Sequence, residues 1–218
     1  MKFNKLLLIL NYSLGYIIIY PLVIYIFLQS EYLAITISAV VALCITVYLL
    51  LPKLKDDIKD IKITKLLLSG ILQTMLIFAI VVVISLILMV IGIEENSLNQ
   101  KILEEYFKDP EYKLFICLEI VFFAPLVEEG VFRYALSGLI RKSKALYVIV
   151  SALLFGSIHL VDGLFSGNYS DFIYLVIYGP IGAVLALNYL RHKENICYPI
   201  VAHLIYNGVQ LWLMSLML

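Results

Sequence analysis

The stretch from Ala124 to Arg133 reads APLVEEGVFR, and it places Glu128, Glu129 and Arg133 inside an otherwise apolar run. A charged side chain at the centre of a membrane helix costs at least about 2.5 to 3.5 kcal/mol, so such residues are rare and face the interior of a helix bundle. They are functional candidates by default. The stretch therefore predicts a buried helix and supplies the first three residues of a candidate site.

The composition around this stretch is that of a membrane protein. Of the 218 residues, 63% are hydrophobic and 15% are charged; the mean hydropathy is +1.00 and the formal net charge is zero. Apolar runs close to the roughly 20 residues that span a bilayer recur along the chain. We expect one integral membrane domain over residues 1–218, in contact with the lipid bilayer. Without an excess of basic residues, nothing indicates nucleic acid, and three isolated cysteines predict neither disulfides nor a thiolate metal site.

The apolar runs predict an all-α fold, a polytopic transmembrane helical bundle of about seven spans. Residues 1–93 hold the three N-terminal spans, and residues 114–218 hold four spans that we expect to form the catalytic core. The expected spans are Leu6–Leu28, Tyr32–Leu51, Leu66–Ile93, Leu114–Ile140, Ala145–Leu164, Phe172–Leu190 and Ile196–Leu218.

Alternate connections between these spans are basic. Lysine and arginine gather at the N-terminus and in the second, fourth and sixth connections: Lys2, Lys5, Lys53, Lys55, Lys59, Lys62, Lys65, Arg141, Lys142, Lys144, Arg191 and Lys193. Basic connections stay in the cytoplasm. We therefore expect a multi-pass protein of the cell membrane with a cytoplasmic N-terminus and a C-terminus outside.

A short helix is expected in the third connection. Ser97 with Gln100 three residues later is typical of a capping box, and Pro110 ends the apolar periodicity that follows. The third histidine of the chain, His192, falls in a basic connection, and we interpret it as a solvated residue.

Polar residues in three spans are expected at one depth. At about 1.5 Å per helical residue, the distance of each from the basic end of its own span is similar: Glu128 lies roughly 20 Å from Arg141, His159 roughly 22 Å from Lys144, Asn207 roughly 21 Å from Lys193, and His203 roughly 15 Å from the same lysine. Since the spans are measured from independent connections, the agreement favours one site over separate structural polar residues.

Helical spacing suggests separate roles for these residues. Glu129 and Arg133, at i and i+4, are placed to pair, and a purely structural pair is the simpler interpretation of them. Glu128 is left without a cation on its own helix, which suits a general base. Phe155 and His159 share one helical face and His203 and Asn207 share another. Gly156 and Gly208 predict close approach of neighbouring helices.

At these residues the chain resembles the CAAX protease and bacteriocin-processing family (CPBP, or Abi) of intramembrane proteases. The family pattern of two glutamates with a following arginine matches Glu128, Glu129 and Arg133. Its phenylalanine and histidine four residues apart match Phe155 and His159, and its last pair matches His203 and Asn207. The ordered trio of motifs covers residues 114–218 and shows no departure from the pattern.

The resemblance implies an intramembrane endopeptidase whose substrate is a peptide or membrane protein, active in bacteriocin processing or immunity. Glu128 would activate water with His159, and His203 and Asn207 would bind a metal or stabilise an oxyanion. Glu129, Arg133 and Phe155 would support the site.

The mechanism stays open at this point. Glu128, His159 and His203 are the ligand types of a catalytic zinc site, so zinc is the candidate cofactor. The metal-free alternative uses Glu128 as general base with hydrogen-bond donors aimed at the oxyanion, and the absence of an HExxH pair favours it.

Two other functional classes remain. A non-catalytic immunity or scaffold protein would keep the fold and bind a peptide or partner membrane protein. A transporter would show repeated halves, which this sequence lacks. Its richness in Ile, Lys, Asn and Tyr is typical of an AT-rich bacterial genome, which argues against prenylated substrates. The sequence does not set the oligomeric state.

Overall fold

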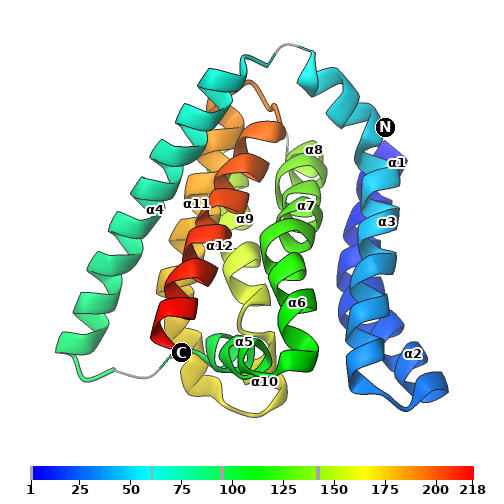
Figure 1. Cartoon of the computed structure of the whole chain (residues 1–218). Coiled ribbons are helices and arrows are strands. Elements are labelled where there is room, and N and C mark those ends of the chain that lie inside the picture. The colour runs from blue at the N-terminus through cyan, green and yellow to red at the C-terminus, as the bar shows by residue number, and fades with distance from the viewer. Residues whose placement is uncertain (1, 60, 94–95, 141–142) are drawn as a thin grey trace.

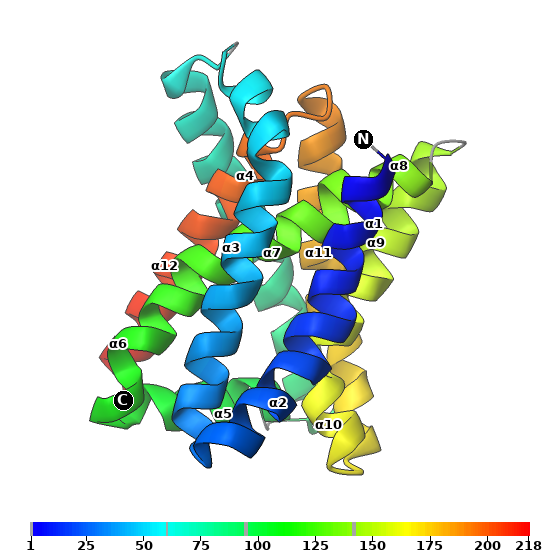
Figure 2. The same cartoon turned by 90° about the vertical axis from the view of Figure 1, so that its right-hand side faces the viewer.

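The computed structural model describes residues 2–59, 61–93, 96–140 and 143–218. It is 89% helical, and no strand occurs in these ranges. The helices stand side by side as a bundle, which Figure 1 and Figure 2 show from two directions at 90°. The predicted all-α, polytopic bundle is therefore confirmed.

Each predicted span falls on a helical segment. The first three spans are Lys2–Leu28 (α1 Lys2–Leu10, the π-helix η1 Asn11–Ile19, α2 Tyr20–Leu28), α3 (Glu31–Ile58) and α4 (Ile63–Val90). After α5 (Leu98–Lys108), a continuous helical run consists of α6 (Pro110–Leu118), the π-helix η2 (Glu119–Phe123), α7 (Ala124–Glu129), the π-helix η3 (Gly130–Ala135) and α8 (Leu136–Leu139). The remaining segments are α9 (Lys144–Ile158), α10 (Val161–Phe165), the 3-10 helix η4 (Tyr169–Tyr174), α11 (Leu175–Arg191) and α12 (Cys197–Met217).

Five helical segments are long and apolar enough to cross a membrane by length and composition: Phe3–Leu28, Leu33–Ile58, Ile63–Val90, Tyr169–Arg191 and Cys197–Met217. The two other expected spans differ from these for physical reasons. The run Pro110–Leu139 carries the buried charges of the candidate site, and α9 has only 15 residues. The chain is a multi-pass membrane protein, while the number of seven crossings stays a prediction.

The basic connections meet at one end of the bundle. The start of α1, the α3–α4 connection, the start of α9 and the α11–α12 connection lie together at the top of Figure 1, whereas α5, α10 and the C-terminus lie at the bottom. We call these the basic end and the acidic end. Arg141 and Lys142, which entered the orientation argument, lie outside the described residues. The assignment of the basic end to the cytoplasm stays a prediction.

Small residues bring α9 and α11 together at the level of the site. A Cβ added at Gly156 would lie 2.6 Å from Leu175 Cδ1 and 3.0 Å from the backbone nitrogen of Gly179. The predicted close approach at Gly156 is confirmed, and it fixes α9 against the centre of the bundle. The prediction for Gly208 is wrong, because a Cβ there would meet no atom within 4 Å.

Two predictions for the connections have different outcomes. The helix after Ser97 is present as α5, and Ser97 Oγ accepts a hydrogen bond from the backbone N–H of Gln100 at 3.3 Å. His192, predicted to be solvated, is half-buried instead. Its ring stacks on Tyr198 with centroids 3.7 Å apart, and its Nδ1 bonds the Asn188 carbonyl at 3.0 Å.

Candidate active site

The helix that carries the glutamates has an irregular winding with an identifiable cause. In η2, the N–H of Ala124 bonds the carbonyl of Glu119, five residues earlier. In the same register the next carbonyl, that of Ile120, would receive its bond from residue 125, but Pro125 has no N–H. Asn207 Nδ2 donates to the Ile120 carbonyl oxygen at 2.8 Å. Asn207 thus joins α12 to the helix just before the two glutamates.

Glu129, Arg133 and His203 form a buried polar chain across two helices. Arg133 Nε lies 2.7 Å from Glu129 Oε2, and both side chains are 0% exposed. The N–H of Nε is not aligned with that oxygen, so the contact is an ion pair more than a hydrogen bond. The other carboxylate oxygen, Oε1, lies 2.9 Å from His203 Nδ1. The predicted pairing of Glu129 with Arg133 is present, and Glu129 also orients His203.

Arg133 is fixed on its far side by α9. Its Nη1 donates to Ser151 Oγ at 3.2 Å, and its guanidinium carbon lies 5.0 Å from the centroid of the Phe155 ring. Ser151 in turn donates to the carbonyl of Phe132 at 3.3 Å. The ion pair is therefore held between α9 and the glutamate helix.

Glu128 differs from Glu129 in its distance from a cationic partner, because Glu129 has Arg133 at 2.7 Å. Glu128 is buried, and its Oε2 atom has no hydrogen-bond partner among the described residues. The nearest charged group is His203, whose Nε2 lies 3.9 Å from that oxygen. This separation is too long for a direct hydrogen bond and fits a group that both side chains contact.

His159 is the C-terminal capping residue of α9. It contacts Phe155, whose ring also lies near His203. The Nδ1 atom of His159 lies 2.9 Å from the Phe155 carbonyl oxygen, which only accepts, so in the neutral ring Nδ1 carries the hydrogen and Nε2 is an acceptor. The Phe155 ring centroid lies 4.9 Å from that of His159 and 5.7 Å from that of His203. Phe155 is therefore a neighbour of both histidines and of the Arg133 guanidinium.

Two further residues adjoin the site and were not predicted. Glu119 accepts a hydrogen bond from Tyr16 of η1, and it was detectable as a fourth ionisable residue in the same apolar run. Tyr178 of α11 stacks on His159, with centroids 4.7 Å apart and an interplanar angle of 19°. Its hydroxyl lies 2.7 Å from Ser97 Oγ at the start of α5. No local signal in the sequence marks Tyr178.

The donor set does not fit a metal centre in this structure. Across the described ranges, no three His, Cys, Asp or Glu side chains come together in a way that could hold a metal ion. Glu128 and His203 approach each other, but no ion pair or hydrogen bond joins either of them to His159 within those ranges. Zinc stays a prediction from residue types.

A groove of about 480 Å³ opens beside the site at the acidic end, lined by α4, α5, α11 and α12. Tyr178 and Ile120 line this groove and also contact His159 and Asn207 respectively. Most of the remaining wall is apolar, including Val81 and Met214. The groove therefore connects the surface of the bundle with residues that touch the site.

Comparison with known proteins identifies the part of the chain that holds the site. The family model for Rce1-like proteins, described as type II CAAX prenyl endopeptidase Rce1-like, matches residues 110–209, slightly under half of the chain. No curated protein and no solved structure gives a significant match. The matched range contains all seven predicted site residues, and the match supports an intramembrane protease of the CAAX type.

Proposed function

We propose that the protein hydrolyses peptide bonds inside the membrane with Glu128 as its general base, and the match of residues 110–209 to the family model for Rce1-like type II CAAX prenyl endopeptidases supports this. The substrate is a peptide or a membrane-protein segment. The observation that carries this assignment is the buried Oε2 atom of Glu128, which has no hydrogen-bond partner among the described residues and lies 3.9 Å from His203 Nε2.

A water molecule held between Glu128 and His203 is the nucleophile in this proposal. Glu128 takes one proton from the water as its oxygen attacks the peptide carbonyl carbon, which gives a tetrahedral oxyanion. Glu128 then delivers the same proton to the leaving nitrogen, and the C–N bond breaks to give a carboxyl group and an amine. General acid–base transfer of this kind contributes about 10²- to 10⁴-fold in rate.

The histidines have distinct places in that sequence. His159 has its Nδ1 hydrogen committed to the Phe155 carbonyl, so its Nε2 accepts a hydrogen bond from the water and orients it. His203 is held at Nδ1 by Glu129, and in its doubly protonated form it donates from Nε2 to the oxyanion. A preorganised donor of this type is typically worth about 2.7 to 4 kcal/mol.

Three residues in this scheme position the reacting groups and do not meet the substrate: Glu129, Arg133 and Asn207. Glu129 and Arg133 fix the ring of His203, and Asn207 fixes the segment before Glu128 through the Ile120 carbonyl. The site is thus divided between groups that meet the substrate and groups that position them. No step requires a metal.

The groove at the acidic end is the proposed route for the substrate. Its apolar wall suits a hydrophobic segment, and Tyr178 and Ile120 place its inner end against the site. In this proposal an extended peptide lies there with the carbonyl of its cleaved bond directed toward Glu128. The substrate class that follows is a peptide with an apolar stretch next to the cleaved bond.

The test is cleavage of a quenched fluorescent peptide library by the detergent-purified protein. Glu128→Gln is compared with Glu119→Gln, which makes the same chemical change nine residues earlier on the same helical run, where Gln keeps an acceptor for Tyr16. We expect Glu128→Gln to lose about 10²- to 10⁴-fold in rate and Glu119→Gln to retain activity. Thermal unfolding confirms that each variant is folded.

A zinc chelator added to each sample decides between the two chemistries. Activity that survives chelation supports the general-base scheme, and activity that is lost and restored by zinc overturns it. No cleavage by any folded sample would favour the alternative of a non-catalytic immunity or scaffold protein.

A further inference from the structure

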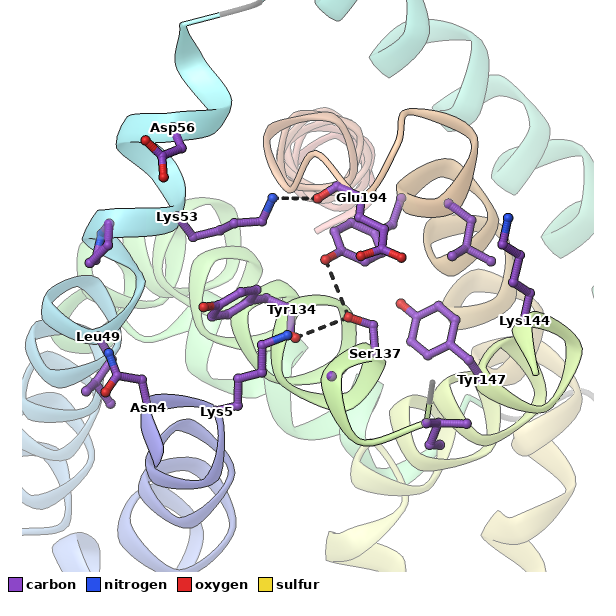
Figure 3. A pocket seen from close by; sticks show the side chains of 15 residues that line it. Asn4, Lys5, Leu49, Lys53, Asp56, Tyr134, Ser137, Lys144, Tyr147 and Glu194 are labelled. Atoms are coloured by element: carbon purple, nitrogen blue, oxygen red, sulfur yellow. Dashed lines mark hydrogen bonds between the residues drawn. The ribbon is translucent and has the colours of Figure 1, made fainter. Parts of the chain in front are cut away.

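A second cavity lies at the basic end and has no part in the proposed reaction. Its volume is about 630 Å³, and its walls come from α1, α3, α8, α9 and α11. Lys5, Lys53 and Lys144 line it together with the hydroxyl-bearing residues Ser137 and Tyr147. Figure 3 shows Lys5, Ser137 and Tyr147 along one wall and Lys53 with Glu194 across from them. The lining thus gathers ammonium groups around one space, while the hydroxyls of Ser137 and Tyr147 donate to the carbonyls of Tyr134 and Phe132.

The positive charge of this cavity is only partly offset. Two carboxylates, Asp56 and Glu194, line it with the three lysines. Asp56 Oδ1 is already paired with Lys59 at 2.8 Å. Lys53 Nζ is held by Asp57 at 2.6 Å and by the Glu194 carbonyl at 2.7 Å. The net charge of the lining is positive, and the surrounding connections hold most of the lysines and arginines of the chain.

Lys5 is the least expected of the lining residues. Its side chain is only 7% exposed, and its Nζ lies 4.2 Å from the centroid of the Tyr134 ring. A lysine is almost never buried without compensating contacts. A buried ammonium in a cavity wall, with an aromatic face holding its position, is a built feature and not a side chain extended into solvent.

From these observations we propose that the cavity at the basic end binds the phosphate headgroup of an anionic phospholipid. Phosphate oxygens accept hydrogen bonds from ammonium and hydroxyl groups. Basic pockets between transmembrane helices at the cytoplasmic side are suited to anionic lipid headgroups. A space of about 630 Å³ lies within the range of small-molecule sites and holds a headgroup more fully than an inorganic phosphate ion.

The site is separate from the reaction. None of its lining residues is among the predicted catalytic residues, and the substrate groove opens at the opposite end. Lipid binding can therefore be measured in protein whose catalytic residues are unchanged, and its failure would leave the proposed hydrolysis untouched.

Native mass spectrometry of the detergent-purified full chain tests the proposal with added phosphatidylglycerol or phosphatidylcholine. The variants are Lys5→Gln, Lys144→Gln and the double variant, with Lys62→Gln as the control because Lys62 is exposed at the same end but does not line the cavity. We expect phosphatidylglycerol to bind more tightly than phosphatidylcholine. Its affinity should fall about fivefold for each lysine removed and roughly thirtyfold for both, with no change in Lys62→Gln.

Three results would overturn the assignment. Equal binding of the two lipids removes the requirement for negative charge. An equal loss in Lys62→Gln assigns the effect to diffuse surface charge. Inorganic phosphate that displaces the lipid at comparable concentration, with the same lysine dependence, assigns the site to a soluble phosphate. If Lys5→Gln does not fold, the exposed Lys144→Gln alone carries the comparison.

Discussion

One ion pair at the centre of the bundle and one at its basic end have opposite surroundings. At the centre, Glu129 and Arg133 are 0% exposed and lie 2.7 Å apart. At the basic end, Lys59 and Asp56 also pair, at 2.8 Å, but their side chains are 70% and 73% exposed. The distances are nearly equal, so distance alone does not tell what a pair does. The exposure of the two side chains decides what each pair contributes to stability.

The two ion pairs differ in their access to solvent. A buried ion pair must compensate the loss of hydration of both groups, and removing one partner leaves an unpaired charge in a medium that cannot solvate it. An exposed pair exchanges each partner for water at little loss. The central charges therefore act as one rigid unit that aims His203, whereas Lys59 and Asp56 can each exchange the other for water.

The largest effect on stability is expected for Arg133→Leu. This change leaves the buried Glu129 carboxylate without its cation, which should destabilise the protein by about 3 to 5 kcal/mol. Equilibrium unfolding in mixed detergent micelles measures the loss. A loss below that of ordinary surface variants would show that the central pair is not a unit.

Gly156→Ala is expected to have the next largest effect. The added Cβ would lie 2.6 Å from Leu175 Cδ1, and overpacking of this kind typically costs about 1 to 3 kcal/mol. Gly208→Ala is the matched control, since its Cβ would meet nothing within 4 Å. The same unfolding assay compares them, and equal stability of the two variants would contradict the close contact between α9 and α11.

Lys59→Gln should leave the unfolding midpoint unchanged within the scatter of repeated measurements. Its partner is solvated, so the remaining carboxylate of Asp56 regains water. A midpoint shift as large as that of Arg133→Leu would erase the distinction between the two settings.

His192 at the basic end is expected to affect only the pH dependence of stability. Burial lowers the pKa of His192, and the nearby cations Lys65 and Arg191 lower it further. The unfolded chain then binds the proton more readily than the folded protein, so the contribution of His192 to stability is present above its unfolded pKa of about 6.5. It is lost as the pH falls below that value. The pH dependence of unfolding between about pH 7 and pH 5 should be shallower in His192→Gln, and an unchanged slope would contradict this.

The sequence alone predicted the helices, the pairing of Glu129 with Arg133 and the approach of His203 to the glutamates, because these follow from patterns along single helices. The i, i+4 spacing of Glu129 and Arg133 gave their pairing, and the depth argument brought His203 to the two glutamates. The same reasoning predicted the contact at Gly156. These features depend on helical periodicity and on the number of residues from a connection.

The sequence did not predict side-chain contacts that depend on how one helix is rotated relative to another. Tyr178 meets His159, and Tyr16 meets Glu119, only because of how separate helices turn toward each other. The π-helical winding around Pro125 was also missed, although it decides that Asn207 bonds a backbone carbonyl. The prediction assumed regular α-helical hydrogen bonding in this segment. The segment before Pro125 instead has a hydrogen bond between residues five apart.

The most direct test of the central claim is a double-mutant cycle on kcat/KM with Glu128→Gln, His203→Gln and the variant carrying both, on one cleaved peptide. If both side chains act on one water, the double variant should lose about as much as the worse single variant, because groups that work as a unit are strongly non-additive. Losses that multiply would show that the two residues act independently, and that result would contradict a shared water between Glu128 and His203.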